Sequence, residues 1–591
     1  MFKHNRLALL AGTIFLFEVC AHIPLSLFRY YFDKNTPIQF VGLLISASIF
    51  GLVMLMRRER TAIPPIVIAV ITGLIGSQFV SAFLSKNFIG SIVGDTGRHA
   101  GIAALVALIV IAIFHGQLQF GQFNKALMLY VLAVGVTEII ALLQYFNLLT
   151  MPGIENTIMS TFGNLDFFAA FIGTSIPLAI YASLFSPKKL RPIFWGVALG
   201  GIVCVTLTGA KQGYIDILMT SFFICVYFLW QLLKKISKNR FILPSYSPLV
   251  GTVITLVLVL VWVELIFVLP FANWNIPHVS DDPQVLIRGV MWMAALNIFR
   301  SHIFFGAGPD QFGYYYEHYR TVQSTVVLSG SSTNDAHSAP FQTLATTGLL
   351  GTLAFVALMG IVIYSLLSLL KRYPEMKSGM LLLGLFLFVY FTNAAISPMT
   401  NTAKYLFWSV CGFIVGAANL HSSSQKRFLL FSKRISATFI SALIVFSLFI
   451  AANYSLAQWR FIQWSEIRGP DATIQIDAKI SPYIPCTVYF SRLADIVASG
   501  GNIALEKLSK DQVSINPRCL EANMKLAILA NNREDLAQMR RSVYKVIELA
   551  PSRRDVLDLA TIYAVRDGDL SLQKTIATQL ANMGIRTIEI R

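Results

Sequence analysis

Charged residues are scarce in this sequence of 591 residues. Only 13% are Asp, Glu, Lys or Arg and 55% are hydrophobic, whereas soluble domains carry about 25% charged residues. A chain that lies mainly in water is therefore excluded. The 38 glycines follow no three-residue period, and six cysteines are too few for a small disulfide-stapled scaffold. The composition predicts an all-α membrane protein that crosses the bilayer several times.

The sequence also lacks the motifs of several enzyme classes. It has no Gly-rich loop of the P-loop or dinucleotide type, which disfavours a nucleotide-driven reaction. Its histidines and cysteines show no metal-ligand spacing. The net charge of +17 is not gathered on a soluble domain, which argues against a nucleic-acid partner. We therefore expect no metal, no cofactor and no nucleic acid.

Apolar runs long enough to cross about 30 Å of hydrocarbon are the main feature that is present. We predict 13 spans, at residues 7–27, 38–56, 61–84, 100–115, 125–145, 166–185, 192–210, 214–233, 248–269, 340–370, 378–397, 403–420 and 435–453. With the N-terminus inside, the inner segments contain 20 Lys and Arg and the outer loops only 9. Because basic residues in short loops stay in the cytoplasm, this bias predicts a cytoplasmic N-terminus and an external C-terminal tail.

Two stretches depart from the pattern of spans and short loops. Residues 270–339 form a large external loop within a transmembrane domain of residues 1–453, and residues 454–591 form the tail. The tail shows a 34-residue repeat, with Pro517 followed by Pro551 and Asp535 by Asp569. That period is typical of tetratricopeptide helix pairs, although an unrelated helical bundle is the alternative. Cys486 and Cys519 lie in this tail, where a disulfide is chemically possible.

Four acidic residues, Glu18, Glu138, Asp216 and Glu264, fall within predicted spans. Buried carboxyl groups in a membrane are costly and mark ion or proton pathways in transporters. A secondary transporter or lipid-linked glycan flippase is therefore a rival interpretation. The four positions do not recur in two matching halves of the chain, and this disfavours the transporter.

Several cations and one histidine fall on the predicted outer side. Arg98 precedes the fourth span, Lys211 lies between the seventh and eighth, and Arg288, Arg320 and His337 lie in the large loop. Cations at the outer interface can hold the oxygens of a lipid diphosphate, or can simply anchor helices by reaching to water. The His337 imidazole is a candidate general base for a hydroxyl group, with Asp335 to orient it, although a single loop histidine often has no function.

Five segments together resemble the bacterial O-antigen ligase and O-antigen polymerase superfamily. They are Phe162–Ala169, Thr208–Gly213, Arg288–Trp292, Phe305–Phe312 and His337 with Gln342, Gly348 and Gly351. The resemblance covers about residues 90–420. Lys211 stands where the family has Arg, and Ser338 stands where it has Asn. Both departures bear on subfamily and acceptor more than on overall class.

The resemblance implies a glycosyltransferase of the bacterial inner membrane. Such enzymes transfer a glycan from an undecaprenyl diphosphate carrier to an acceptor hydroxyl at the outer face. It implies that His337 is the general base and that Arg288 and Lys211 bind the diphosphate, with Arg98 and Arg320 as weaker candidates. The helical tail resembles that of protein O-oligosaccharyltransferases and could bind a protein partner. Protein Ser or Thr, lipid A core and another glycan all remain open as acceptors.

Overall fold

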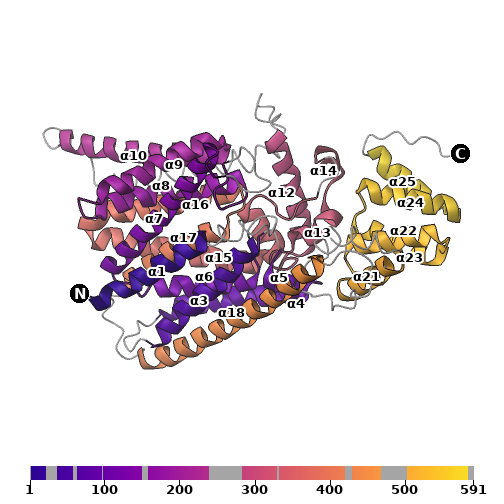
Figure 1. Cartoon of the computed structure of the whole chain (residues 1–591), viewed down its shortest axis with the longest axis horizontal. Coiled ribbons are helices and arrows are strands. Elements are labelled where there is room, and N and C mark those ends of the chain that lie inside the picture. Colours follow the sequence, from indigo (N-terminus) through magenta and orange to yellow (C-terminus); the bar gives the residue numbers. More distant parts are fainter. Residues whose placement is uncertain are drawn as a thin grey trace.

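The computed structural model describes residues 2–20, 36–56, 63–95, 98–149, 158–237, 283–328, 332–419, 429–466, 483 and 502–582. Within these residues the regular structure is helical and contains no strand. A long helical bundle is followed by a smaller group of five helices near the C-terminus (Figure 1). The predicted all-α class is confirmed for this part of the chain.

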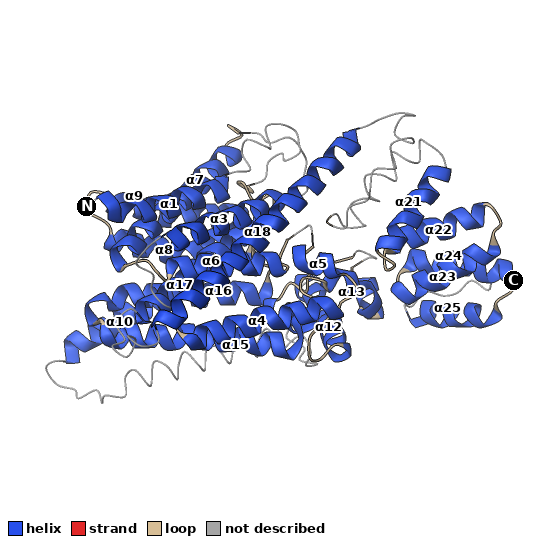
Figure 2. Ribbon diagram, turned by 90° about the horizontal axis from the view of Figure 1, so that it is seen from below, coloured by secondary structure: helices blue, strands red, loops and turns tan. Residues whose placement is uncertain are grey.

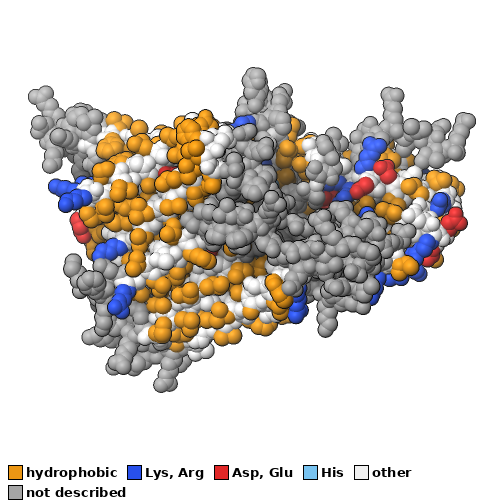
Figure 3. All heavy atoms as spheres, viewed as in Figure 1, with side chains coloured by type: hydrophobic (Ala, Val, Ile, Leu, Met, Phe, Trp, Pro, Cys, Tyr) orange, Lys and Arg blue, Asp and Glu red, His pale blue; other side chains and the backbone are white. Residues whose placement is uncertain are grey.

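The bundle contains the helices that were predicted to span the membrane. Its helices are α1 (Phe2–Cys20), α3 (Thr36–Met56), α4 (Pro65–Leu84), α6 (Ile102–His115), α7 (Phe120–Tyr145), α8 (Leu165–Phe185), α9 (Arg191–Thr208), α10 (Lys211–Ser237), α15 (Ala339–Arg372), α16 (Lys377–Ile396), α17 (Asn401–Asn419) and α18 (Leu429–Glu466). Apolar side chains cover most of the bundle surface seen in Figure 3, as expected of a surface that meets lipid.

Nine helices of the described residues are long and apolar enough to cross a membrane, namely α3, α4, α7 to α10, α15, α16 and α18. Each coincides with a predicted span. Three further predicted spans coincide with α1, α6 and α17, which do not meet that criterion; α6 has only 14 residues. The predicted span 248–269 and Glu264 lie outside the described residues, so the total of 13 stays a prediction.

Small residues allow α6 and α17 to pack closely in the centre of the bundle. Gly412 and Gly416 of α17 lie directly against the backbone of Ala112 and Gly116. A side chain at either glycine would collide with that backbone. Small residues spaced by four positions are the usual means by which membrane helices approach closely. The pairing fixes the start of α17 next to the segment that precedes α6.

The helix α15 is broken near its beginning. Gly348 has φ of 66° inside the helix, a conformation that favours glycine. The backbone groups freed by the break bond to the segment before Gly308, since Ala307 N donates to Ala345 O and Gly308 N to Thr346 O, each at 3.0 Å. On the other side of the break, Leu349 N donates to Ile303 O at 2.8 Å. The two segments therefore form one unit.

One end of the bundle carries four more helices, and we call it the loop end. They are α5 (Phe88–Val93), α12 (Pro283–Ser301), α13 (Phe312–Tyr319) and α14 (Val322–Val327). The predicted large loop is therefore partly helical. Trp292, Phe312, Tyr316 and Phe341 form a local core there, which joins α12 and α13 to the start of α15. This core supports the backbone on both sides of residue 337.

The C-terminal group contains α21 (Asn502–Ile515), α22 (Leu520–Asn532), α23 (Leu536–Leu549), α24 (Arg554–Asp567) and α25 (Leu570–Asn582). We call it the repeat domain. α22 and α24 begin 34 residues apart, as do α23 and α25. Asp535 and Asp569 cap the second helix of each pair by accepting from backbone N–H groups. Helix starts thus follow the predicted period, whereas membership of the tetratricopeptide class stays a prediction.

The repeat domain docks on the loop end, as Figures 1 and 2 show. The Tyr314 hydroxyl donates to Asn516 Oδ1 at 2.8 Å, and the Thr325 hydroxyl to Ser552 O at 3.0 Å. The Arg518 guanidinium lies over the Tyr315 ring, 4.9 Å from its centroid. Cys519 at the start of α22 is disulfide-bonded; Cys486, the other cysteine of the tail, lies outside the described residues.

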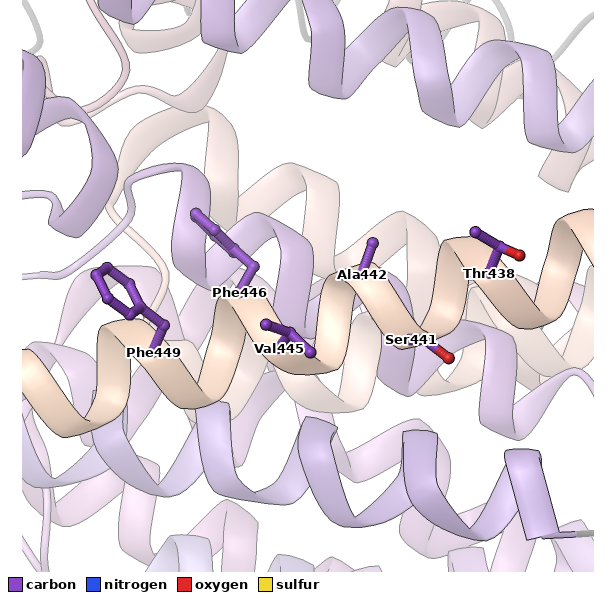
Figure 4. Close-up of a pocket in the computed structure, with 6 residues that line it drawn as sticks. All are labelled: Thr438, Ser441, Ala442, Val445, Phe446 and Phe449. Atoms are coloured by element: carbon purple, nitrogen blue, oxygen red, sulfur yellow. The ribbon is translucent and has the colours of Figure 1, made fainter.

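An open hollow of about 620 Å³ runs along α18. The side chains lining it belong to one helix: Thr438, Ser441, Ala442, Val445, Phe446 and Phe449 (Figure 4). Its surface is almost wholly apolar and has no ionisable group. It offers nothing for acid–base chemistry or phosphate binding, so the candidate site must be sought at the loop end.

Candidate functional site

The backbone at His337 is held in an unusual conformation by its neighbour Asp335. His337 has φ of 51°, in the left-handed region. The Asp335 carboxylate accepts a hydrogen bond from the His337 backbone N–H, an Asx turn that stabilises such a conformation. Ser338 then caps α15, with Pro340 in its first turn. The sequence Asp-Ala-His-Ser-Ala-Pro therefore fixes the imidazole immediately before a helix.

The imidazole contacts show which nitrogen can act as a base. His337 Nδ1 lies 3.2 Å from the carbonyl oxygen of Asp335. Because a carbonyl oxygen only accepts, Nδ1 carries the hydrogen and the lone pair is on Nε2. Burial lowers the pKa of His337 below its ordinary value of 6.5; the Asp335 charge opposes this effect, and the Arg98 and Arg288 charges add to it. The imidazole is therefore neutral at neutral pH, as a general base must be.

Arg98 lies beside this histidine and is joined to Asp335. Its Nη1 atom is 2.9 Å from Asp335 Oδ2, and both side chains are nearly buried. Its Nη2 atom donates to Asn334 Oδ1 at 3.3 Å. Sequence analysis treated Arg98 as a weaker phosphate ligand, whereas the structure places its guanidinium against the histidine loop. Arg98 is thus well placed to orient Asp335.

Arg288 joins α12 to the end of α16. Its Nε atom donates to Ile396 O at 3.0 Å, and Nη1 donates to Gln284 O at 3.1 Å. The guanidinium is half-exposed, and its charge acts on the His337 imidazole. A partly exposed cation whose charge acts on a neutral base can hold an anionic leaving group.

Lys211 is the first residue of α10, and its side chain is exposed. The turn before it uses Gly209 with φ of 67°. The next residue, Gln212, donates through its amide to Asp166 O in the first turn of α8. The two sequence elements 162–169 and 208–213 therefore meet. Farther along α10, the Asp216 carboxylate accepts from Asn393 of α16 at 2.7 Å. Asn393 lies three residues before Ile396, whose carbonyl oxygen Arg288 contacts. These contacts link the helix of Lys211 to Arg288 through α16.

Arg320 faces another part of the loop end. It is buried at the end of α13, 3.2 Å from Glu317 Oε2. The charge of Glu317 also acts on Glu521 and Arg553 of the repeat domain. Arg320 therefore belongs to a charged cluster beside the repeat domain. Its ion pair with Glu317 does not place it at the His337 imidazole.

Residues 217–356 match the model of a protein family described as O-antigen ligase. In this segment the chain is similar to O-antigen ligases. The resemblance seen in the sequence is thereby confirmed, and the matched residues include both Arg288 and His337. None of the curated proteins compared with the chain matches it.

Two charged residues near the histidine loop, Asp310 and Lys404, were not assigned to the site from the sequence. Asp310 is 7% exposed and accepts hydrogen bonds from two backbone N–H groups of residues 95 and 100. Burial raises the pKa of Asp310 to about 7; the Asp95 charge adds to this, and the Ala100 N–H and the Lys404 charge oppose it. Its position within the recognised element Phe305–Phe312 was the signal available in the sequence. Lys404 carried no such signal.

Possible metal ligands are not gathered in the described part of the chain. No group of three or more His, Cys, Asp or Glu side chains there is arranged to hold a metal ion. The charged groups that act on one another near His337 are of both signs, with Asp95, Asp310 and Asp335 opposed to Arg98, Arg288 and Lys404. Such an arrangement can move a proton and bind an anion.

Proposed function

We propose that this protein transfers a glycan from an undecaprenyl diphosphate carrier to an acceptor hydroxyl at the outer face of the bacterial inner membrane. The O-antigen ligase match supports glycan transfer as the class of reaction. The single observation that carries the mechanism is the His337 backbone, which Asp335 fixes immediately before α15, with the imidazole within range of the Arg288 charge.

The reaction needs a base for the acceptor and a cation for the donor. His337 Nε2 removes the acceptor proton as the acceptor oxygen attacks the anomeric carbon, and the bond from that carbon to the diphosphate oxygen breaks. Negative charge grows on the leaving diphosphate, where Arg288 and Lys211 screen it. Asp335 stabilises the imidazolium that forms, because its charge favours the protonated ring. The proton then leaves to solvent, and the base is restored.

The proposed orientation has the loop end and the repeat domain in the periplasm. Lys and Arg side chains gather at the opposite end of the bundle on the face seen in Figure 3, as expected for a cytoplasmic side. A disulfide at Cys519 is consistent with an oxidising compartment. The repeat domain, which we interpret as tetratricopeptide-like, is a candidate surface for a protein acceptor, alongside lipid A core or a glycan chain.

The test uses purified protein in liposomes with a lipid-linked glycan donor and an acceptor. We expect glycan transfer without an ion gradient. His337→Gln should lower kcat by at least about a hundredfold, the usual contribution of a general base. The matched control is His302→Gln, because His302 also lies at the loop end but bonds to Ile298 O within its own helix. Equal activity of the two variants would refute the proposed role of His337, and gradient-dependent movement without a covalent product would indicate a transporter.

A further inference from the structure

Two segments distant in sequence meet at the buried carboxylate of Asp310. Its Oδ2 atom accepts from Asp95 N at 2.8 Å and from Ala100 N at 2.9 Å. Asp95 and residues 98–100 belong to one short turn, in which Arg98 N and His99 N donate to Asp95 O, and Asp310 closes this turn by bonding to both of its ends. A Cβ atom added to Gly94 would lie 2.5 Å from the same oxygen, so the chain approaches the carboxylate as closely as a glycine permits.

The closed turn carries the side chains that reach the histidine loop. Asp95 Oδ1 accepts from Asn334 Nδ2 at 2.6 Å, and Arg98 of the same turn pairs with Asp335. Asp335 in turn fixes the His337 backbone. A continuous series of contacts therefore runs from Asp310 through residues 95–100 to the imidazole, although Asp310 does not contact it.

The turn is also tied to the helices of the bundle. Asn401 at the start of α17 donates to the carbonyl oxygen of Arg98 at 3.2 Å. His99 Nε2 is 2.9 Å from the Tyr454 hydroxyl of α18. Asp310 is the contact that joins this anchored turn to the segment 306–311, and that segment is itself bonded to the broken start of α15.

Asp310 has one negatively charged and one positively charged neighbour. The Asp95 carboxylate faces it with like charge, and the Lys404 ammonium of α17 faces it with opposite charge. Lys404 also feels Asp335 and Arg98. A single oxygen can accept both hydrogen bonds whether the side chain at position 310 is an ionised carboxylate, a protonated carboxyl group or an amide. Closure of the turn therefore depends on the oxygen rather than on the charge.

We propose that Asp310 is a positioning residue for His337, which it holds in place by closing the turn 95–100 that carries Arg98 and Asp95 to the histidine loop. The inference rests on the proposed function. Asp310 contacts neither the donor nor the acceptor in this proposal. Loss of the Asp310 carboxylate should therefore lower kcat and leave donor binding intact.

Two substitutions separate the oxygen from the charge. Asp310→Ala removes both hydrogen bonds, and kcat should fall at least about tenfold because each good hydrogen bond contributes about 1 kcal/mol. The KM for donor should stay unchanged, since Arg288 and Lys211 are untouched. Asp310→Asn keeps the acceptor oxygen and should retain kcat within about threefold. Glu375→Ala, which removes an exposed carboxylate in the short helical turn Pro374–Met376 between α15 and α16, is the matched control and should behave as wild type.

The pH profile adds a readout that a merely structural role would not move. In Asp310→Ala, Arg98 no longer depresses the pKa of His337, so the acid limb of kcat should move to higher pH. Where Asp310→Ala fails to fold, Asn334→Ala cuts the same series of contacts at a half-buried position and should give the same selective loss of kcat. Full kcat with an unshifted profile, or a loss in Asp310→Asn as large as in Asp310→Ala, would overturn the proposal.

Carbethoxylation of His337 by diethyl pyrocarbonate, followed by mass spectrometry, measures the imidazole without any substrate. Its rate should change in Asp310→Ala and not in Glu375→Ala; an unchanged rate in Asp310→Ala overturns this inference alone. If His337→Gln instead transfers glycan normally, the proposed function falls, whatever the carbethoxylation rates show.

Discussion

Polar side chains are satisfied in different ways in the bundle and at the loop end. Within the bundle, the Thr174 and Ser175 hydroxyls donate to carbonyl oxygens four residues earlier in their own helix, each at 2.7 Å. At the loop end, Asp310 bonds to a residue 215 positions away, and Arg98 to one 236 positions away. These two hydroxyl groups are satisfied within one helix, although the bond between Asp216 and Asn393 shows that some polar pairs of the bundle join two helices. The site, in contrast, exists only when distant segments meet.

The comparison predicts that equal substitutions should have unequal effects, and two glycines of α15 provide the strongest test. A Cβ atom at Gly348 would lie 2.5 Å from Gly306 N, and its φ is positive, whereas Gly360 has open space around it. Gly348→Ala should cost about 1–3 kcal/mol from backbone strain alone and abolish transfer. Gly360→Ala should be neutral or slightly stabilising. Thermal unfolding and transfer assays on both variants check this, and equal stability would contradict it.

Arg288 provides the next largest effect, because it belongs to the site through tertiary contacts. Arg288→Ala should raise the KM for the lipid-linked donor by about tenfold to a hundredfold, as expected for a lost charge-assisted bond to phosphate. Arg300→Ala is the control on the same helix, since Arg300 is exposed and contacts Asn297 on its own helix. Unchanged donor kinetics in Arg288→Ala would remove Arg288 from the proposed diphosphate site.

The ion pair between Arg98 and Asp335 should affect how kcat depends on pH. Both charges act on the pKa of His337, in opposite directions. Arg98→Gln removes the charge that lowers this pKa, so the acid limb of kcat should move to higher pH. Asp335→Asn removes the charge that raises it and keeps an oxygen for the turn, so the limb should move to lower pH. Shifts in the same direction would show that the pair does not act on the imidazole electrostatically.

The smallest effect is expected within the bundle. Thr174→Val removes a hydroxyl bonded only to nearby backbone of the same helix, where the carbonyl oxygen keeps its helical partner. Stability should change by less than about 1 kcal/mol, and transfer should not change. A loss of transfer comparable with that of Arg98→Gln would erase the distinction between the two regions.

The same distinction explains what could be predicted from the sequence. Apolar runs specify helices locally, and nine of the predicted spans coincide with membrane-length helices of the described residues. His337 and Arg288 could be selected because they lie in recognisable elements. The pairing of Arg98 with Asp335 could not, since it depends on how α6 and α15 are placed in space. Asp310 was seen only as part of a motif, because its buried partners are backbone N–H groups that no side-chain pattern encodes.

The hydrogen bonds between the repeat domain and the loop end have a mechanical consequence. The Tyr314 hydroxyl of α13 bonds to Asn516, and the Thr325 hydroxyl of α14 bonds to Ser552. Two separate bonds, from two neighbouring helices, therefore hold the repeat domain against the loop end that contains the reactive imidazole. A molecule bound by those C-terminal helices would therefore be held at a constant distance from the loop end.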